Sequence, residues 1–444
     1  MGFFKNLFSS SKSGSVNPDI QFGRFSDSYK DEVKYDCWDK ALAHYEEEQY
    51  VQTYTSFFNY LLDDELGNVT FKQELGKLTF TLYQGSKLIT GYADSRKFYA
   101  EAKVAKFEAE HIGVFRRLLE VNYQLKYSRY AIDNEQNLTI VFSTYSIDGS
   151  PYKLYYALKE LATKADNADD VLISSYEGLS PINNTHIRTI THTEKQLKYQ
   201  YLKSTIAEAE EALASSNLNI SKHPGALSYL YLDLAYRIDY LLKPEGKTMD
   251  TVVLINHAFF KENGKTIEQK NGYIKNQFNK LKQRTFEKFE RELYEVKSTF
   301  GVTAPSGQSR ILDFIKSEIG NMDWYKANGH DTFALAIPSY IVGYCLYSYS
   351  MPSPMRLLLQ LYYRVTEYPY FEQLGFKDSF VNKSSVLQAN KIKEAIKIIV
   401  KTYEEDYDQL DPKLKAVDYT DIFSFTKSYL LMIADMNYSR KDLR

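Results

Sequence analysis

The N-terminal part of the chain, up to residue 180, alternates between two hydrophobic periodicities. Residues 27–60 repeat apolar side chains at intervals of three and four, as Tyr35, Trp38 and Tyr45 show, which predicts a helix with one buried face. In residues 78–82, leucine and phenylalanine alternate with threonine, which is the period of a strand. Similar patterns predict strands at residues 69–71, 87–93, 98–104 and 138–142, and helices at residues 110–130 and 151–170. This order predicts an α+β domain in which helices cover an antiparallel sheet.

From residue 194 onward the periodicity is almost entirely helical. The predicted helices cover residues 194–215, 225–242, 266–299, 308–320, 333–349, 384–405 and 418–436. Before them, residues 178–193 contain Pro181 and show no period, which is typical of a linker. We therefore predict four parts, namely a flexible N-terminus at 1–26, an α+β domain at 27–178, a linker at 179–193 and an all-α region at 194–444.

The sequence predicts a cytoplasmic protein without a transmembrane segment. Residues 332–355 contain no charged residue, but their prolines and tyrosines favour a buried helix over a membrane span. Cys37 and Cys345 are far apart and form no CxxC pattern, which excludes a disulfide framework and fits a reducing compartment. Residues 1–8 are too short for a signal peptide, and contact of this segment with a membrane or a partner stays an open alternative.

No motif of the chain points to catalysis or to a cofactor. The seven histidines form no HExxH and no helical pair, so a metal site has no support. Gly-Lys-Thr occurs at 246–248 and 264–266, but Leu241 and Phe259 occupy the places where a phosphate-binding loop needs its first glycine. The formal net charge is -2, which gives no global signal for nucleic-acid binding. We therefore expect no catalytic residue, no cofactor, no metal and no nucleic-acid partner.

Residues 115–142 carry a family resemblance. A helix that contains Leu118-Leu119-x-x-Asn122 leads to the pair Ile132-Asp133, then to a polar turn and an apolar strand. The next helix includes Ala165-Asp166, with which such domains often close. In this order, residues 27–178 resemble type III secretion chaperone-like domains of the CesT/YbjN sort. The resemblance implies a small α+β fold without a catalytic residue that binds extended segments of other proteins and often forms homodimers.

These chaperones usually stand alone, whereas this chain adds a long helical region, so the broader interpretation is an adaptor. The leading hypothesis is a non-enzymatic, chaperone-like protein that captures a partner polypeptide on its sheet surface. Aromatic side chains of the predicted strands would supply the contact area, at Tyr83, Tyr92, Phe98, Tyr99 and Tyr145. Two alternatives are a structural or assembly component of a larger bacterial complex and an enzyme with its site in the helical region. Asn122 is expected to be structural, because its helix carries a buried stripe.

Overall fold

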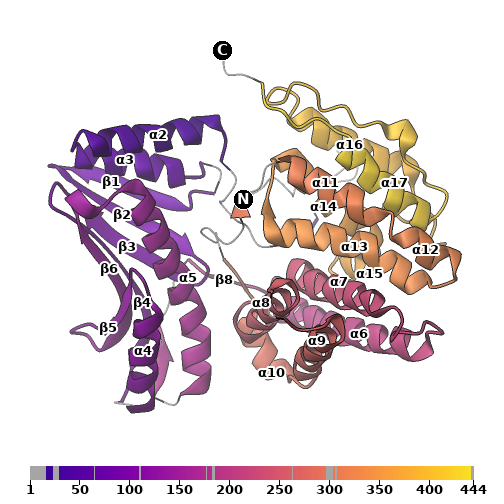
Figure 1. Ribbon diagram of the computed structural model, residues 1–444, viewed down its shortest axis with the longest axis horizontal. Helices are drawn as coiled ribbons and strands as arrows, with labels where there is room; N and C mark the ends of the chain where they lie inside the picture. Colours follow the sequence, from indigo (N-terminus) through magenta and orange to yellow (C-terminus); the bar gives the residue numbers. More distant parts are fainter. Residues whose placement is uncertain are drawn as a thin grey trace. The chain divides into compact units, whose positions relative to one another are not determined.

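The structure is a computed structural model with two compact units. It describes residues 17–23, 30–64, 66–109, 112–176, 178–182, 186–262, 264–296, 304–305 and 308–441. The helical unit takes its residues from 1–24, 190–293 and 304–444, and the sheet unit from 25–189 and 294–303. The prediction of an N-terminal antiparallel sheet with helices, followed by a mostly helical region, is confirmed at this level (Figure 1).

The sheet unit is built on one antiparallel sheet. Its strands are β1 (Val69–Glu74), β2 (Lys77–Gln84), β3 (Lys87–Ala93), β4 (Lys97–Phe107), β5 (Arg129–Ile132), β6 (Asn137–Tyr145) and β7 (Leu179–Pro181). The strand order is β1-β2-β3-β4-β6-β5, and β7 pairs with the end of β4. The predicted linker at 179–193 is therefore partly sheet, because three residues at its start continue the ladder of β4. So short a strand shows no periodicity in sequence.

Helices cover one face of this sheet. They are α2 (Glu32–Glu46), α3 (Tyr50–Leu61), α4 (Ile112–Gln124) and α5 (Pro151–Ser175). Figure 1 shows α2 and α3 side by side at the β1–β2 end of the sheet. The single helix predicted over residues 27–60 is thus two, because Glu48 has a left-handed φ of 59° that ends the first one. Ser150 caps α5 through its side chain and Pro151 is its first residue, as the sequence predicts.

The helix predicted over residues 110–130 is shorter than expected. It ends at Gln124, and the chain then turns back to form β5. The Asn122 side chain holds this turn, because its oxygen accepts from the Tyr130 backbone nitrogen at 2.7 Å and its amide donates to the Tyr130 carbonyl at 3.2 Å. Glu160 adds three backbone bonds to residues 126–128. Asn122 therefore takes the place of a neighbouring strand along the edge of β5.

Replacing Asn122 with alanine should lower the free energy of unfolding by about 1 to 2 kcal/mol, because both backbone groups of Tyr130 lose their hydrogen-bond partner at a partly buried edge of the sheet. Urea unfolding measures the change. Tyr123→Ala is the matched control. Tyr123 is the next residue of the same helix and its side chain is 93% exposed, so this substitution should change stability by less than about 0.5 kcal/mol. Equal stability of the two variants would remove the structural role assigned to Asn122.

The helical unit contains twelve α-helices among the described residues. They are α6 (His192–Ser215), α7 (Pro224–Leu242), α8 (Gly246–Phe260), α9 (Ile267–Lys282), α10 (Phe286–Phe289), α11 (Gln308–Ile319), α12 (Met322–Ala327), α13 (Asp331–Ser348), α14 (Ser353–Thr366), α15 (Tyr368–Gln373), α16 (Ala389–Thr402) and α17 (Ile422–Ala434). α7 and α13 pack together at its centre. The uncharged stretch at 332–355 forms most of α13 and the start of α14, largely buried in this core. None of the helices in the described part of the chain is long and apolar enough to cross a membrane.

One predicted helix of this unit is wrong. The pattern over residues 266–299 contains α9 and α10, and the described chain then forms β9 (Tyr294–Glu295). This strand pairs with β8 (Arg188–Thr189) of the predicted linker. The helix is interrupted at Thr285, which precedes the short α10. The apolar residues of 286–296 therefore pack into the local core and do not extend α9. A further short pair, β10 (Ala304–Pro305) with β11 (Tyr349–Ser350), lies among the helices.

The N-terminal residues 17–23 pack against the helical unit. The Phe22 ring lies 4.8 Å from the ring of Phe371, and the Gly23 nitrogen donates to the Tyr240 carbonyl at 2.8 Å. The flexible N-terminus predicted over 1–26 is therefore wrong for residues 17–23, because an apolar ring anchors them. Residues 1–16 and 24–26 lie outside the described residues. The sheet unit is thus inserted between two segments of the helical unit.

Candidate functional site

The two faces of the sheet differ in what covers them. Phe98 and Ile140 point to the helix side, where they share one core with Leu154 and Leu158 of α5. Neighbouring residues along a strand point to opposite faces. We call the other side the open face. Its side chains across the central strands include Lys77, Thr79, Thr90, Tyr92, Lys97, Tyr99, Glu101 and Tyr145.

A pair of tyrosines lies at the centre of the open face. Tyr92 and Tyr99 are directly opposite on β3 and β4, and their rings stack with centroids 5.6 Å apart at 28°. The Lys77 ammonium lies 4.1 Å from the Tyr92 ring centre, and the Lys97 ammonium lies 5.3 Å from that of Tyr99. The pair and its two cations form a partly exposed aromatic surface with positive charge at its margin.

The hydroxyl of Tyr99 is held as a hydrogen-bond donor. It donates to a carboxylate oxygen of Glu101 at 2.6 Å. Burial and then the bond to Glu101 raise the pKa of Tyr99 well above its usual value. The tyrosine therefore stays neutral at physiological pH, and its ring orientation is fixed by this bond. A ring that is already fixed loses less conformational entropy when a ligand packs on it than a mobile ring would.

The five aromatic residues predicted to bind a partner do not all reach this surface. Tyr92, Tyr99 and Tyr145 lie on the open face, and Tyr145 is 71% exposed. Tyr83 points the same way, but the His186 ring lies 5.4 Å from it and covers part of it. The prediction that Phe98 contacts a partner is wrong, because Phe98 lies in the core and is 0% exposed. Strand alternation alone separates Phe98 from its neighbour Tyr99.

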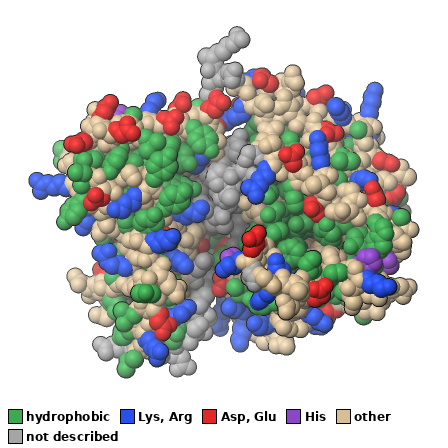
Figure 2. Space-filling model, viewed as in Figure 1, with side chains coloured by type: hydrophobic (Ala, Val, Ile, Leu, Met, Phe, Trp, Pro, Cys, Tyr) green, Lys and Arg blue, Asp and Glu red, His purple; other side chains and the backbone are tan. Residues whose placement is uncertain are grey.

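A second aromatic cluster lies on the helix side of the unit. The Trp38 ring packs 4.8 Å from Tyr60 and 5.0 Å, edge-on, from Tyr152. Tyr152 and Tyr156 are more than half exposed. Figure 2 shows hydrophobic side chains gathered over the part of the sheet unit where α2, α3 and the start of α5 lie. The sheet unit therefore offers a second aromatic surface that an experiment must distinguish from the open face.

The helical unit contains a largely buried charged cluster. Arg237 forms ion pairs of 3.1 Å with Asp233 and with Glu367, and the Tyr201 hydroxyl donates to Glu367 at 2.8 Å. Burial raises the pKa of Asp233 to about 6, against the lowering effect of Arg237. Asp233 and Tyr201 are nevertheless buried in the helix core. The cluster joins α6, α7 and Glu367, the residue that follows α14.

The first Gly-Lys-Thr sequence also has a structural role. It begins α8, where the backbone nitrogens of Lys247 and Thr248 each donate to the Glu292 carboxylate at 3.1 Å. A carboxylate from the same chain thus occupies the helix N-terminus, where a phosphate would bind in a phosphate-binding loop. Among the described side chains there is no group of three or more His, Cys, Asp or Glu residues that could hold a metal ion.

Sequence reasoning missed Lys77, Lys97 and the charged cluster. The positions of the two lysines beside the tyrosine rings depend on the register between neighbouring strands, which the pattern of a single strand does not contain. Asp233 and Arg237 did carry a signal, since an i,i+4 charged pair inside an otherwise apolar helix predicts burial with a third partner.

No known protein family model and no curated protein matches this chain.

Proposed function

We propose that the sheet unit binds an extended segment of a partner protein across its open face. The observation that carries this proposal is the Tyr92–Tyr99 stack, which is partly exposed on a sheet whose other face is covered by helices. Tyrosine is one of the residue types enriched among the hot spots of protein interfaces. A ring that is already held in place also loses less entropy when a partner binds. This role also agrees with the family resemblance of residues 27–178.

The chemistry of the open face defines the segment that fits it. Apolar and aromatic side chains of the partner pack on the Tyr92 and Tyr99 rings, and acidic side chains pair with Lys77 and Lys97. Threonines between them, such as Thr79 and Thr90, accept or donate hydrogen bonds. The preferred partner is therefore an extended segment that mixes acidic and aromatic residues.

The two edge strands of the sheet, β1 and β5, differ in whether a partner segment can pair with them as an added strand. Along β5, the Asn122 side chain already takes both backbone groups of Tyr130. At the other edge, β1 pairs with β2 alone among the described strands. Main-chain pairing with a partner therefore belongs to β1, next to the threonine-bearing strand β2.

The double variant Tyr92→Ser/Tyr99→Ser should lose the partner that co-purifies with the wild type, by at least about tenfold for two hot-spot rings. Quantitative mass spectrometry of purified complexes from the native host measures the loss, and a thermal melt confirms that the variant is folded. Cross-linking from position 92 identifies the bound segment.

Two further variants serve as controls for the loss of the partner. Tyr123→Ser removes an exposed tyrosine of α4 outside both aromatic surfaces and should retain the partner. Tyr152→Ser/Tyr156→Ser alters the helix side and should retain it as well. If the helix-side variant loses the partner and the open-face variant keeps it, the open face is not the binding surface.

A further inference from the structure

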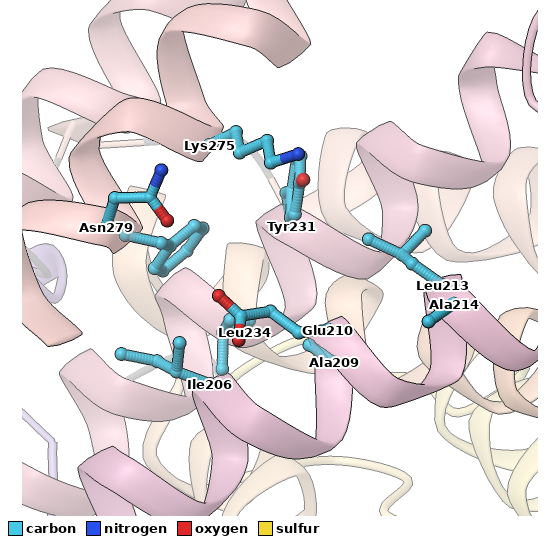
Figure 3. A pocket seen from close by; sticks show the side chains of 10 residues that line it. Ile206, Ala209, Glu210, Leu213, Ala214, Tyr231, Leu234, Lys275 and Asn279 are labelled. Atoms are coloured by element: carbon cyan, nitrogen blue, oxygen red, sulfur yellow. The ribbon is translucent and has the colours of Figure 1, made fainter.

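A cavity of about 400 Å³ lies within the helical unit, between α6, α7 and α9 (Figure 3). Apolar side chains form its floor and walls, among them Ile206 and Leu213 of α6, Leu234 of α7 and Phe278 of α9. Its size falls in the range of small-molecule sites, which is about 300 to 1,000 Å³. It is too small for the several turns of a partner helix, since a helix is about 10 Å wide.

Three hydrogen-bond donors line this cavity, from Lys275, Asn279 and Tyr231. In Figure 3 the Lys275 side chain extends from α9 toward Tyr231. Tyr231 is 5% exposed, and its side chain forms part of the cavity wall. Burial, with the charge of Glu210, raises the pKa of Tyr231 to about 12, so this hydroxyl keeps its proton. A bound carboxylate could accept hydrogen bonds from all three donors.

The charges around the cavity favour an anion. Glu210 is the only carboxylate of the lining, and Lys282 pairs with it at 2.5 Å. Lys275 has no carboxylate partner among the described residues. The charges of Glu210, Lys282 and Lys275 therefore sum to one positive charge beside the apolar floor. A cationic ligand would lie close to this charge and would leave the three donors unpaired.

We propose that this cavity binds a small amphipathic anion, with its apolar body on Ile206, Leu234 and Phe278 and its carboxylate beside Lys275. The hydroxyl of Tyr231 and the amide of Asn279 donate to the oxygens of that carboxylate. The site belongs to the helical unit and is independent of the binding function proposed for the sheet unit.

Isothermal titration calorimetry with decanoate, and with the neutral decanol as its matched analogue, tests the proposal on the full chain. Decanoate should bind one site per chain and bind at least tenfold more tightly than decanol. Lys275→Gln should weaken decanoate binding at least tenfold and leave decanol binding unchanged. Tyr231→Phe should weaken decanoate binding to a smaller extent. Lys280→Gln, an exposed lysine of the same helix outside the lining, should bind like the wild type.

Equal affinity for decanoate and decanol, or an unchanged affinity in the folded Lys275→Gln variant, would overturn the proposal. Absence of decanoate binding together with a self-associated species that Leu213→Glu dissolves would assign the cavity to a second copy of the chain and overturn it equally. Thermal melts of each variant establish that a lost affinity does not reflect a lost fold.

Discussion

Replacing Arg237 with methionine should lower the free energy of unfolding by about 3 to 4 kcal/mol. The substitution keeps the apolar stem but leaves the carboxylates of Asp233 and Glu367 without the cation that pairs with both. Removing one partner of a buried ion pair costs about 3 to 5 kcal/mol, and the lower part of that range applies because the Arg237 side chain retains 17% exposure. Urea unfolding at neutral pH measures the loss.

The pH dependence separates this mechanism from a packing defect. In the folded protein the pKa of Asp233 is raised to about 6, whereas in the unfolded chain an aspartate titrates near about 4. The folded state thus holds this proton more tightly, so the contribution of Asp233 to stability rises as the pH falls from about 6 to about 4. Without Arg237 the deficit should therefore be larger at neutral pH than at about pH 5.

Arg291→Met serves as the control, because Arg291 is exposed and should change stability by less than about 0.5 kcal/mol at either pH. A deficit in Arg237→Met that is the same at both pH values would show that packing, and not the uncompensated carboxylates, carries the effect.

Gly343→Ala should destabilise the protein by about 2 to 3 kcal/mol, although alanine is the better helix former. Gly343 lies in α13 where this helix meets α7, and a Cβ there would lie 2.5 Å from the Cβ of Tyr236. It would also lie 2.6 Å from the Tyr363 hydroxyl, which donates to the Ser339 carbonyl at 3.1 Å. The central helices must separate, or this buried hydrogen bond must break.

Gly272→Ala is the matched comparison for this prediction. Gly272 lies in α9, and a Cβ added there would meet nothing within 4 Å, so the same substitution should raise stability by up to about 1 kcal/mol. Opposite signs in thermal or urea unfolding are expected. If both glycine variants gain stability, the close approach of α7 and α13 at Gly343 is not tight.

The elements that sequence predicts well here are those with a long, regular apolar stripe. The strand expected at residues 87–93 coincides with β3, and α5, α7 and α11 begin within a few residues of their predicted starts. β5 escapes prediction because its four residues are stabilised by the Asn122 side chain and by β6, partners that no local pattern contains. The helix expected at 266–299 is too long because apolar spacing does not mark where a chain turns to pair with distant β8.

The same limit applies to the candidate site. The sequence predicts that Tyr92 and Tyr99 contact a partner, but their stacking depends on the register between β3 and β4, a tertiary property. Phe98 could have been excluded from sequence, since it alternates with Tyr99 and shares the parity of apolar residues along β4. The ion pair between Arg237 and Glu367 joins residues 130 positions apart, which the sequence of α7 alone cannot specify.

Because the sheet unit interrupts the helical unit along the chain, residues 17–23 must wait for their partners while the protein is synthesised. Asn17 bonds to Asp378, 361 positions later, and Phe22 packs on Phe371. At translation rates of about 5 to 20 residues per second this delay is roughly 20 to 70 s. Every strand of the main sheet leaves the ribosome well before then. The nascent chain therefore carries a finished sheet unit behind an uncovered apolar segment, a period in which a chaperone of the host would have the longest access to it.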